Sequence, residues 1–334
     1  MKTNSLLSLI VILLAAVGMS IWLIKKDAGE LATTEPLLGA FSNQLSQLDH
    51  ITLKTAGSTL FQASKMDQQW FASHLGEGTE FPVDLTELSD FITSLQTAKL
   101  SEAKTQNPQN YSRLGVEPVE QQDSTSRLLV LGAQNESFEV LLGNASSNSF
   151  GTFIRQPEQQ QSWLLDQVLD LPTDIHSWLQ NPILNIELID VMSAQRVGDD
   201  GWLVSMNGQQ GLELQFIADN ESLKYPTVIE NSLTAMLTVQ FDQAIPIESA
   251  QLPENASAEL LFETINGTLS ISVFEGEEQN FVVYRYAHQQ WLNDWVFSLS
   301  SFNSGQLTKS RSDFVDVADD SENESDVTEA PVSE

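Results

Sequence analysis

The chain contains one nine-residue pattern twice, and this recurrence constrains its architecture more than any other feature. WLLDQVLDL at residues 163–171 and WLNDWVFSL at residues 291–299 match at five of nine positions, with a constant offset of 128 residues. Tryptophan is scarce, with 7 among 334 residues, so a match that includes one is poorly explained by chance. Self-similarity of this kind predicts a chain built from two related units.

Strands are predicted at the start of each copy. Apolar and polar residues alternate in residues 51–73 and again in residues 186–206, a period typical of half-buried strands. Each run contains a tryptophan after a polar turn. We therefore align Trp202 of the second copy with Trp70 of the first, at an offset of 132.

One amphipathic helix is predicted next in each copy. Asp84 and Thr227 each stand three residues before a glutamate, a spacing typical of a capping box. The apolar residues that follow form one stripe, so each helix should cover one face of its sheet. The stripe residues are Leu85, Leu88, Phe91, Ile92 and Leu95 in the first copy, and Ile229, Leu233, Met236 and Leu237 in the second.

Strands resume after each helix. Residues 127–143 and 258–274 alternate in phase at an offset of 131, and Asn266-Gly267 predicts a type I′ hairpin turn. A further strand ends each copy, as TFIR (residues 152–155) and VVYR (residues 282–285). The nine-residue motif is then predicted to form a helical turn that packs on the sheet, with Asp166 and Asp294 facing water or capping.

The offset between the copies changes along the chain. It rises from 132 at the aligned tryptophans to 143 at the helix starts, and then falls to 131. These changes predict an insertion at residues 211–220 of the second copy and another at residues 110–118 of the first. Both insertions lie between elements, as loops permit.

These patterns predict an α+β protein: an N-terminal transmembrane helix, then two tandem repeats of an antiparallel sheet, each with one covering helix. The expected boundaries are a membrane anchor at residues 1–26, a linker at 27–48, a first repeat at 49–182 and a second at 183–303. Residues 304–334 are expected to be an acidic, disordered tail, since the sequence there is polar and non-periodic.

The predicted anchor begins at Leu6 and ends at Ile24. These 19 residues, LLSLIVILLAAVGMSIWLI, carry no charge and are long enough to span the hydrocarbon core. The apolar run continues past AAVG directly to Lys25, unlike the small-residue cleavage site of a signal peptide, so we expect the segment to be retained. Flanking charges are nearly balanced, and the acidic residues that follow favour an outward-facing domain.

Charge narrows the range of partners. The chain has 46 acidic and 15 basic residues, a net charge of −31, which repels phosphate backbones and makes nucleic acid an unsuitable partner. Such a surface serves solubility or attracts a basic partner. Cysteine is absent from the sequence, which excludes disulfides, thiolate metal sites and a cysteine nucleophile.

No catalytic, cofactor-binding or metal-binding residues are predicted. Ser101 and Lys104 have SxxK spacing, but they follow the first helix and lack the partner motifs of serine acyl-enzymes. Asp199-Asp200-Gly201 reads as a hairpin turn. The histidines occur singly, without metal-ligand spacing, at positions His50, His74, His176 and His288.

Several segments of the first copy carry a family resemblance. NYSRLGVEP (residues 110–118), LLGN (141–144) and FGTFIR (150–155), after an apolar N-terminal segment, resemble the domain-of-unknown-function family numbered 4340. The resemblance covers residues 49–181 well and the second copy more faintly. It implies a membrane-anchored protein of the bacterial inner membrane whose bulk faces the periplasm. It also implies association with ABC transporter components of the gliding-motility auxiliary type, and it carries over no catalytic residue.

The expected function is a non-enzymatic, membrane-anchored periplasmic binding or scaffold protein, accessory to an ABC-type transporter or envelope complex. Its expected partners are the inner membrane, through Leu6 to Ile24, and a transporter or gliding-motility-type auxiliary subunit. Two alternatives stay open. One is an envelope hydrolase with a site assembled from distant residues, and the other is a ligand- or lipid-binding module that uses a groove between the repeats.

Overall fold

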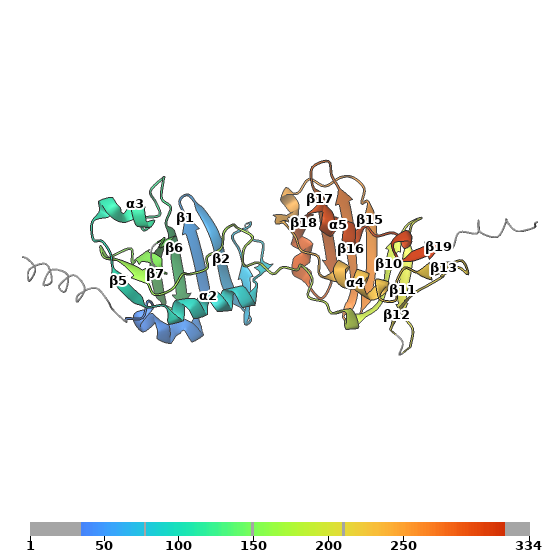
Figure 1. Cartoon of the computed structure of the whole chain (residues 1–334), viewed down its shortest axis with the longest axis horizontal. Helices are drawn as coiled ribbons and strands as arrows, with labels where there is room; N and C mark the ends of the chain where they lie inside the picture. Colours follow the sequence, from blue (N-terminus) through green and yellow to red (C-terminus); the bar gives the residue numbers. More distant parts are fainter. Residues whose placement is uncertain (1–34, 77, 148–149, 209–210, 318–334) are drawn as a thin grey trace, which may run out of the picture. The chain divides into compact units, whose positions relative to one another are not determined.

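The computed structural model describes residues 35–76, 78–147, 150–208 and 211–317, and it divides into two compact units (Figure 1). Unit 1 ends at Leu179 and unit 2 begins at Gln180, close to the predicted boundary at residue 182. The predicted anchor from Leu6 to Ile24 lies outside the described residues. Within the described part, no helix combines the length and apolar character needed to cross a membrane.

Unit 1 is an antiparallel sheet of nine strands in the order β4-β3-β2-β1-β6-β7-β8-β9-β5. Its helix α2 (Leu85–Thr97) lies across the sheet in Figure 1, and a short helix α3 (Tyr111–Leu114) follows β5. The strands are β1 (His50–Thr55), β2 (Ser58–Met66), β3 (Gln69–Ala72), β4 (Phe81–Pro82), β5 (Leu100–Ala103), β6 (Arg127–Ala133), β7 (Glu136–Ala145), β8 (Thr152–Arg155) and β9 (Ser162–Leu165).

Unit 2 is an antiparallel sheet of eight strands in the order β12-β11-β10-β15-β16-β17-β18-β14. Helices α4 (Val228–Leu237) and α5 (Ser301–Leu307) belong to this unit, and α5 packs on β17 and β18. The strands are β10 (Val191–Val197), β11 (Trp202–Met206), β12 (Leu212–Leu214), β14 (Gln243–Pro246), β15 (Ala258–Thr264), β16 (Gly267–Glu275), β17 (Asn280–Tyr286) and β18 (Trp295–Leu299). A separate two-stranded sheet pairs β13 (Glu221–Leu223) with β19 (Val315–Val317).

The two sheets share one strand order once the small edge strand β4 is set aside. In both units three antiparallel strands form a meander, a helix crosses to the far edge of the sheet, and a four-stranded meander returns from the middle. The α+β class and the tandem arrangement are therefore confirmed. The expectation of one covering helix per repeat is wrong for unit 2, which adds α5.

Cross-strand pairing corrects the predicted alignment of the first strands. Ile51 lies opposite Leu131 and Ala194 lies opposite Phe262, so β10 corresponds to β1 at an offset of 143. Strand β11 then corresponds to β2 and β12 to β3, so the run at residues 211–220 is the third strand of the meander and no insertion. The predicted drop to 131 beyond the helix is confirmed, because Leu129 pairs with Val140 as Leu260 pairs with Ile271.

The tryptophans aligned in the sequence do not correspond in the structure. Trp70 lies on the third strand of unit 1 and Trp202 on the second strand of unit 2. Trp163 lies within β9, opposite Ile154 of β8. The position equivalent to Ile154 is Val282, which pairs with Phe297, so Trp163 corresponds to Phe297.

The nine-residue motif therefore falls on different elements. Its first copy starts in a strand, whereas its second copy starts in the short 3₁₀ helix Gln290–Asp294 and then forms β18. The predicted closing helical turn is wrong for the first copy. Five identities in nine residues were weaker evidence than the register of the strands, which burial and backbone pairing fix together.

The two helix starts also differ from each other. The Asp84 carboxylate accepts hydrogen bonds from the Thr86 and Glu87 amides at 2.9 and 3.2 Å, which confirms it as the N-cap of α2. Thr227 caps no amide of α4; its hydroxyl oxygen accepts from the Asn231 side chain at 3.1 Å. Its backbone is not extended (φ −100°, ψ 14°), which turns the hydroxyl away from the helix amides. The second capping box is thus wrong, and the first is confirmed only for its Asp84 half, because the Asp84 amide donates to the Trp178 carbonyl at 2.8 Å and not to Glu87.

The apolar stripes face the cores, with exceptions at one end of α2. Leu88, Phe91 and Leu95 are buried, whereas Leu85 is 57% exposed. All predicted stripe residues of α4 are buried. The hairpin between β15 and β16 is confirmed, but its positive φ falls on Gly267 (119°) and not on Asn266, so the turn is not type I′.

The described residues of both expected flanking segments, 35–48 and 304–317, join the folded units. In the predicted linker, the 3₁₀ helix Gly39–Gln47 packs on unit 1, and Leu37, Leu38 and Phe41 are buried. In the predicted tail, residues 308–317 form a strap on unit 2: Arg196 donates to the Thr308 carbonyl at 2.6 Å, and the Trp202 indole donates to the Lys309 carbonyl at 2.9 Å. The tail boundary at residue 304 is therefore too early, and residues 318–334 lie outside the described part.

Candidate functional site

Segments that are distant in the sequence of unit 1 meet at the end of its sheet where β6 begins and β7 ends. One is the connection from β5 to β6, residues 104–126, which contains the NYSRLGVEP segment. The others are the Gly143-Asn144 end of β7, the start of β8 at Thr152, and the loop that carries Leu169 and Leu171. These are the segments that carried the family resemblance, together with the loop that follows β9.

Arg155, the last residue of β8, holds the connection in place. Its Nε donates to the Val116 carbonyl at 2.9 Å, and its guanidinium lies 4.5 Å from the centre of the Tyr111 ring. Its Nη1 donates to the Pro157 and Gln159 carbonyls, each at 3.0 Å. Burial of the side chain lowers the pKa of Arg155. An arginine with five donors is suited to gathering several backbone carbonyls, and here it joins two loops.

Two further contacts pin the connection to the sheet. The Tyr111 hydroxyl donates to the Gln160 carbonyl at 2.6 Å. A Cβ on Gly143 would stand 2.2 Å from the Leu114 carbonyl oxygen, so only glycine permits the close approach of α3 to β7. Gly115 ends α3 in the left-handed conformation (φ 69°), a helix stop that favours glycine.

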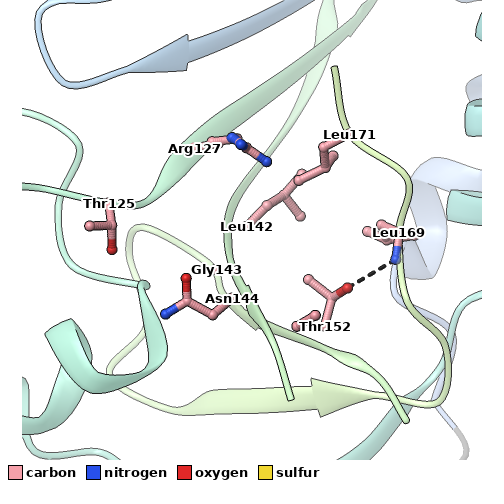
Figure 2. Close-up of a pocket in the computed structure, with 9 residues that line it drawn as sticks. Thr125, Arg127, Leu142, Gly143, Asn144, Thr152, Leu169 and Leu171 are labelled. Atoms are coloured by element: carbon pink, nitrogen blue, oxygen red, sulfur yellow. Dashed lines mark hydrogen bonds between the residues drawn. The ribbon is translucent and has the colours of Figure 1, made fainter. Parts of the chain in front are cut away.

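A pocket of about 240 Å³ lies at this junction (Figure 2). In Figure 2, Thr125 and Asn144 lie on one side of the pocket and Leu169 and Leu171 on the other, where the Thr152 hydroxyl accepts a hydrogen bond from the Leu169 amide at 2.9 Å. That bond ties the loop after β9 to the start of β8. The lining residues are Thr125, Arg127, Leu142, Gly143, Asn144, Ala145, Thr152, Leu169 and Leu171.

Arg127 is the charged residue of this lining. It opens β6 and lies in phase with Leu129 and Leu131, both fully buried, so it occupies the core-facing side of the strand at its open end. Its side chain is half-buried, and among the described residues it forms no hydrogen bond or ion pair. A partly desolvated cation without a protein partner is available to a ligand.

A buried carboxylate stands behind the Thr125 side of the pocket. Glu117 is 5% exposed, and its Oε1 accepts from the Thr125 amide at 2.6 Å and from the Thr125 hydroxyl at 3.2 Å. Its Oε2 is buried and has no hydrogen-bond partner among the described residues. Because Thr125 commits its hydroxyl proton to Glu117, its oxygen presents lone pairs to the pocket.

The sequence motifs considered for chemistry lie elsewhere. Ser101 is on β5 and Lys104 follows that strand, so they do not share a helical turn; Lys104 pairs with Glu102 at 2.8 Å. Gly201 donates back to the Gly198 carbonyl, which confirms the turn at residues 199–201. His50 contacts Ser64 and Thr52, and the His74 Nε2 lies 2.6 Å from the Ile175 carbonyl. In residues 35–317, as far as they are described, no cluster of metal-ligating side chains occurs.

Most segments that form the pocket stand out in the sequence as motifs, but Arg127 and Thr125 were not predicted as lining residues. The sequence did contain one indication of Arg127: it stands two positions before Leu129, so in an alternating strand it lies on the same, buried face. Unit 2 lacks this feature, because Ala258 occupies the position of Arg127, opposite Val273 where unit 1 has Leu142.

Fold and pocket together define a protein of two antiparallel α+β units in which the first unit carries a polar site. The family described as Domain of unknown function (DUF4340) matches residues 70–258, more than half of the chain. The chain belongs to this family, as the resemblance predicted. No curated protein and no solved structure matches the chain.

Proposed function

We propose that this protein is a non-enzymatic binding protein, held at the inner membrane by the segment from Leu6 to Ile24 with its bulk in the periplasm. In this proposal it serves as an accessory to an ABC-type transporter or a related envelope complex, with a gliding-motility-type auxiliary subunit among the candidate partners. The observation that carries a binding role is the convergence of the family segments on the pocket around Arg127.

The pocket is equipped to hold a ligand. Arg127 and the Asn144 amide offer donors, Thr125 offers an acceptor, and the leucines offer apolar contact. A few convergent polar groups in a partly apolar cavity are typical of binding sites. The Arg155 contacts brace the connection that supplies Thr125, so the pocket wall is organised before any ligand arrives.

The acidic surface of the chain favours a positively charged protein partner. At a net charge of −31, long-range attraction would speed encounter with a positively charged surface and weaken as salt rises. A protein partner recognised in this way would lose affinity between low and high ionic strength.

An envelope hydrolase is the second candidate, and one contact favours it. The Thr125 hydroxyl donates to the Glu117 carboxylate, as a nucleophile donates to a general base. The Thr125 amide shares the same oxygen at 2.6 Å, however, which is the arrangement of a loop closure. Hydrolysis of an envelope ester or peptide that is lost in both Thr125→Ala and Glu117→Gln would support the enzyme.

The test of the binding role is affinity purification of the full-length chain from crosslinked membranes. We expect co-purification of ABC-type ATPase or permease subunits, reduced when crosslinking follows a high-salt wash. Recovery of no transporter subunit would count against the proposal. Orientation is checked by an export-dependent reporter fused after Glu334, and activity of a cytoplasmic reporter at that position would overturn the periplasmic placement.

A further inference from the structure

We propose that the pocket of unit 1 binds the anionic group of a small ligand, a carboxylate or a phosphate, beside a short apolar portion of the same molecule. This inference rests on the proposed binding function and specifies the chemistry of its ligand. Arg127 supplies the charge, the Asn144 amide supplies a further donor, and Leu142, Leu169 and Leu171 supply the apolar wall.

Arg127 is the residue that favours an anionic ligand. Its guanidinium is the charged group of the lining and has no protein partner within the described residues. A planar guanidinium matches carboxylate and phosphate oxygens with two parallel hydrogen bonds. In a chain with three acidic residues for each basic one, 46 against 15, an unpaired arginine on the core side of a strand is poorly explained by folding alone.

The apolar part of the ligand follows from the opposite wall. Leu142 and Leu169 are 1% and 5% exposed, and Leu171 is half-buried. In Figure 2, Leu169 and Leu171 lie to one side of the pocket and Thr125 and Asn144 to the other, with Arg127 and Leu142 between them. A ligand can therefore place oxygens near Arg127 and Asn144 while it buries a branched alkyl group on the leucines.

The size of the pocket limits the ligand. About 240 Å³ is below the volume of sites that enclose drug-sized molecules, so the pocket fits one small organic acid or the end group of a longer molecule. The insertion that forms part of the wall is specific to unit 1, and unit 2 has Ala258 in place of Arg127. One such site per chain is expected.

Isothermal titration calorimetry on the full-length chain in detergent micelles tests the proposal, with three probes. They are 4-methylpentanoate, its uncharged amide, and inorganic phosphate. We expect saturable binding of at least one anion and none of the amide. Binding of the pentanoate identifies a carboxylate ligand, and binding of phosphate alone identifies a phosphate ligand.

Two variants locate the binding. Arg127→Gln should weaken the anion at least tenfold, about 1.4 kcal/mol, whereas Arg113→Gln, at an exposed arginine of α3, should leave affinity unchanged. Asn144→Asp adds a negative charge at an exposed position without changing shape, so it should also abolish binding in a chain that folds normally. An unchanged thermal midpoint confirms that each variant is folded.

The proposal is overturned if the amide binds as well as the anion, if Arg127→Gln and Asn144→Asp retain wild-type affinity, or if no probe binds up to about 10 mM. Its failure is distinguishable from failure of the proposed function. Transporter subunits recovered by crosslinking without anion binding would leave the scaffold role standing, and anion binding without recovered subunits would leave the pocket standing.

Discussion

Units 1 and 2 share a strand order, and the connection between one pair of equivalent strands differs clearly in length. From β5 to β6 the chain uses residues 104–126, whereas from β14 to β15 it uses residues 247–257, a stretch 12 residues shorter. The longer connection carries α3 and Glu117 and supplies Thr125 to the pocket wall. The sheet is thus a scaffold common to both units, and an insertion between its elements makes the site, as loops on rigid scaffolds commonly do.

The largest expected effect comes from the close approach of this connection to the sheet. Gly143→Ala places a Cβ 2.2 Å from the Leu114 carbonyl oxygen, a backbone atom that cannot rotate away. We expect unit 1 to lose about 3 kcal/mol of unfolding free energy. Chemical denaturation of the full-length chain, with hydrogen exchange to assign the loss to unit 1, measures it.

The matched control is Gly305→Ala on α5 of unit 2, where an added Cβ meets no atom within 4 Å. An exposed helical alanine should stabilise unit 2 by about 0.5 to 1 kcal/mol. Equal effects of the two substitutions would show that the connection does not contact β7 as described.

A smaller effect separates two arginines that look alike in sequence. Arg155 ends TFIR and is buried against carbonyls of two loops, whereas Arg285 ends VVYR, is exposed, and donates to the neighbouring Tyr284 carbonyl at 2.9 Å. Arg155→Met should cost about 2 kcal/mol because buried carbonyls lose their donors. Arg285→Met should change stability by less than about 0.5 kcal/mol. Thermal unfolding of both variants measures the two stability losses, and equal losses would contradict the roles assigned to Arg155 and Arg285.

Phenylalanine substitutions at Trp202 and Trp70, the tryptophans that the sequence comparison aligned, should differ by about 1 kcal/mol in their cost to the unfolding free energy. Trp202 is 3% exposed, and Trp202→Phe removes the indole donor to the Lys309 carbonyl while it keeps an aromatic ring against Phe314. Trp70 is half-buried, and its indole donates no hydrogen bond to any described residue, so Trp70→Phe should be nearly neutral. Proteolysis within the strap, near residue 309, should accelerate in Trp202→Phe alone.

The smallest effect is a pH dependence confined to unit 1. Burial lowers the pKa of His74 below its usual 6.5, although hydrogen bonds to Ile175 and Gln62 oppose the shift. The unfolded chain therefore binds the proton more readily, and unit 1 should lose stability as pH falls from about 6.5 through the lower folded value. His74→Gln should flatten this part of the stability profile. A wild-type slope that persists in the variant would assign the proton to another group.

Much of the fold follows from local pattern, and the site does not. Strand alternation around Leu129 and Leu260 gave the correct register offset, because burial of one face fixes that phase. The tryptophan match misled because identity over a few residues ignores pairing: Trp163 corresponds to Phe297 once the strands are paired. Of the lining residues, Leu142, Gly143, Asn144, Thr152, Leu169 and Leu171 lie in the repeated or family-like motifs, whereas Thr125 and Arg127 do not. These motifs meet only because β7, β8 and the loop after β9 come together at one end of the sheet.

The sequence by itself determined the α+β class, the doubling of the unit, the capped start of α2 at Asp84, and an acidic surface, because each depends on local periodicity, a single side chain or a sum of charges. Only the tertiary structure decided which strands correspond and which side chains share the pocket. Those outcomes arise from hydrogen-bonded pairing across the sheet and from contacts between separate segments, such as the Leu169 amide that donates to the Thr152 hydroxyl.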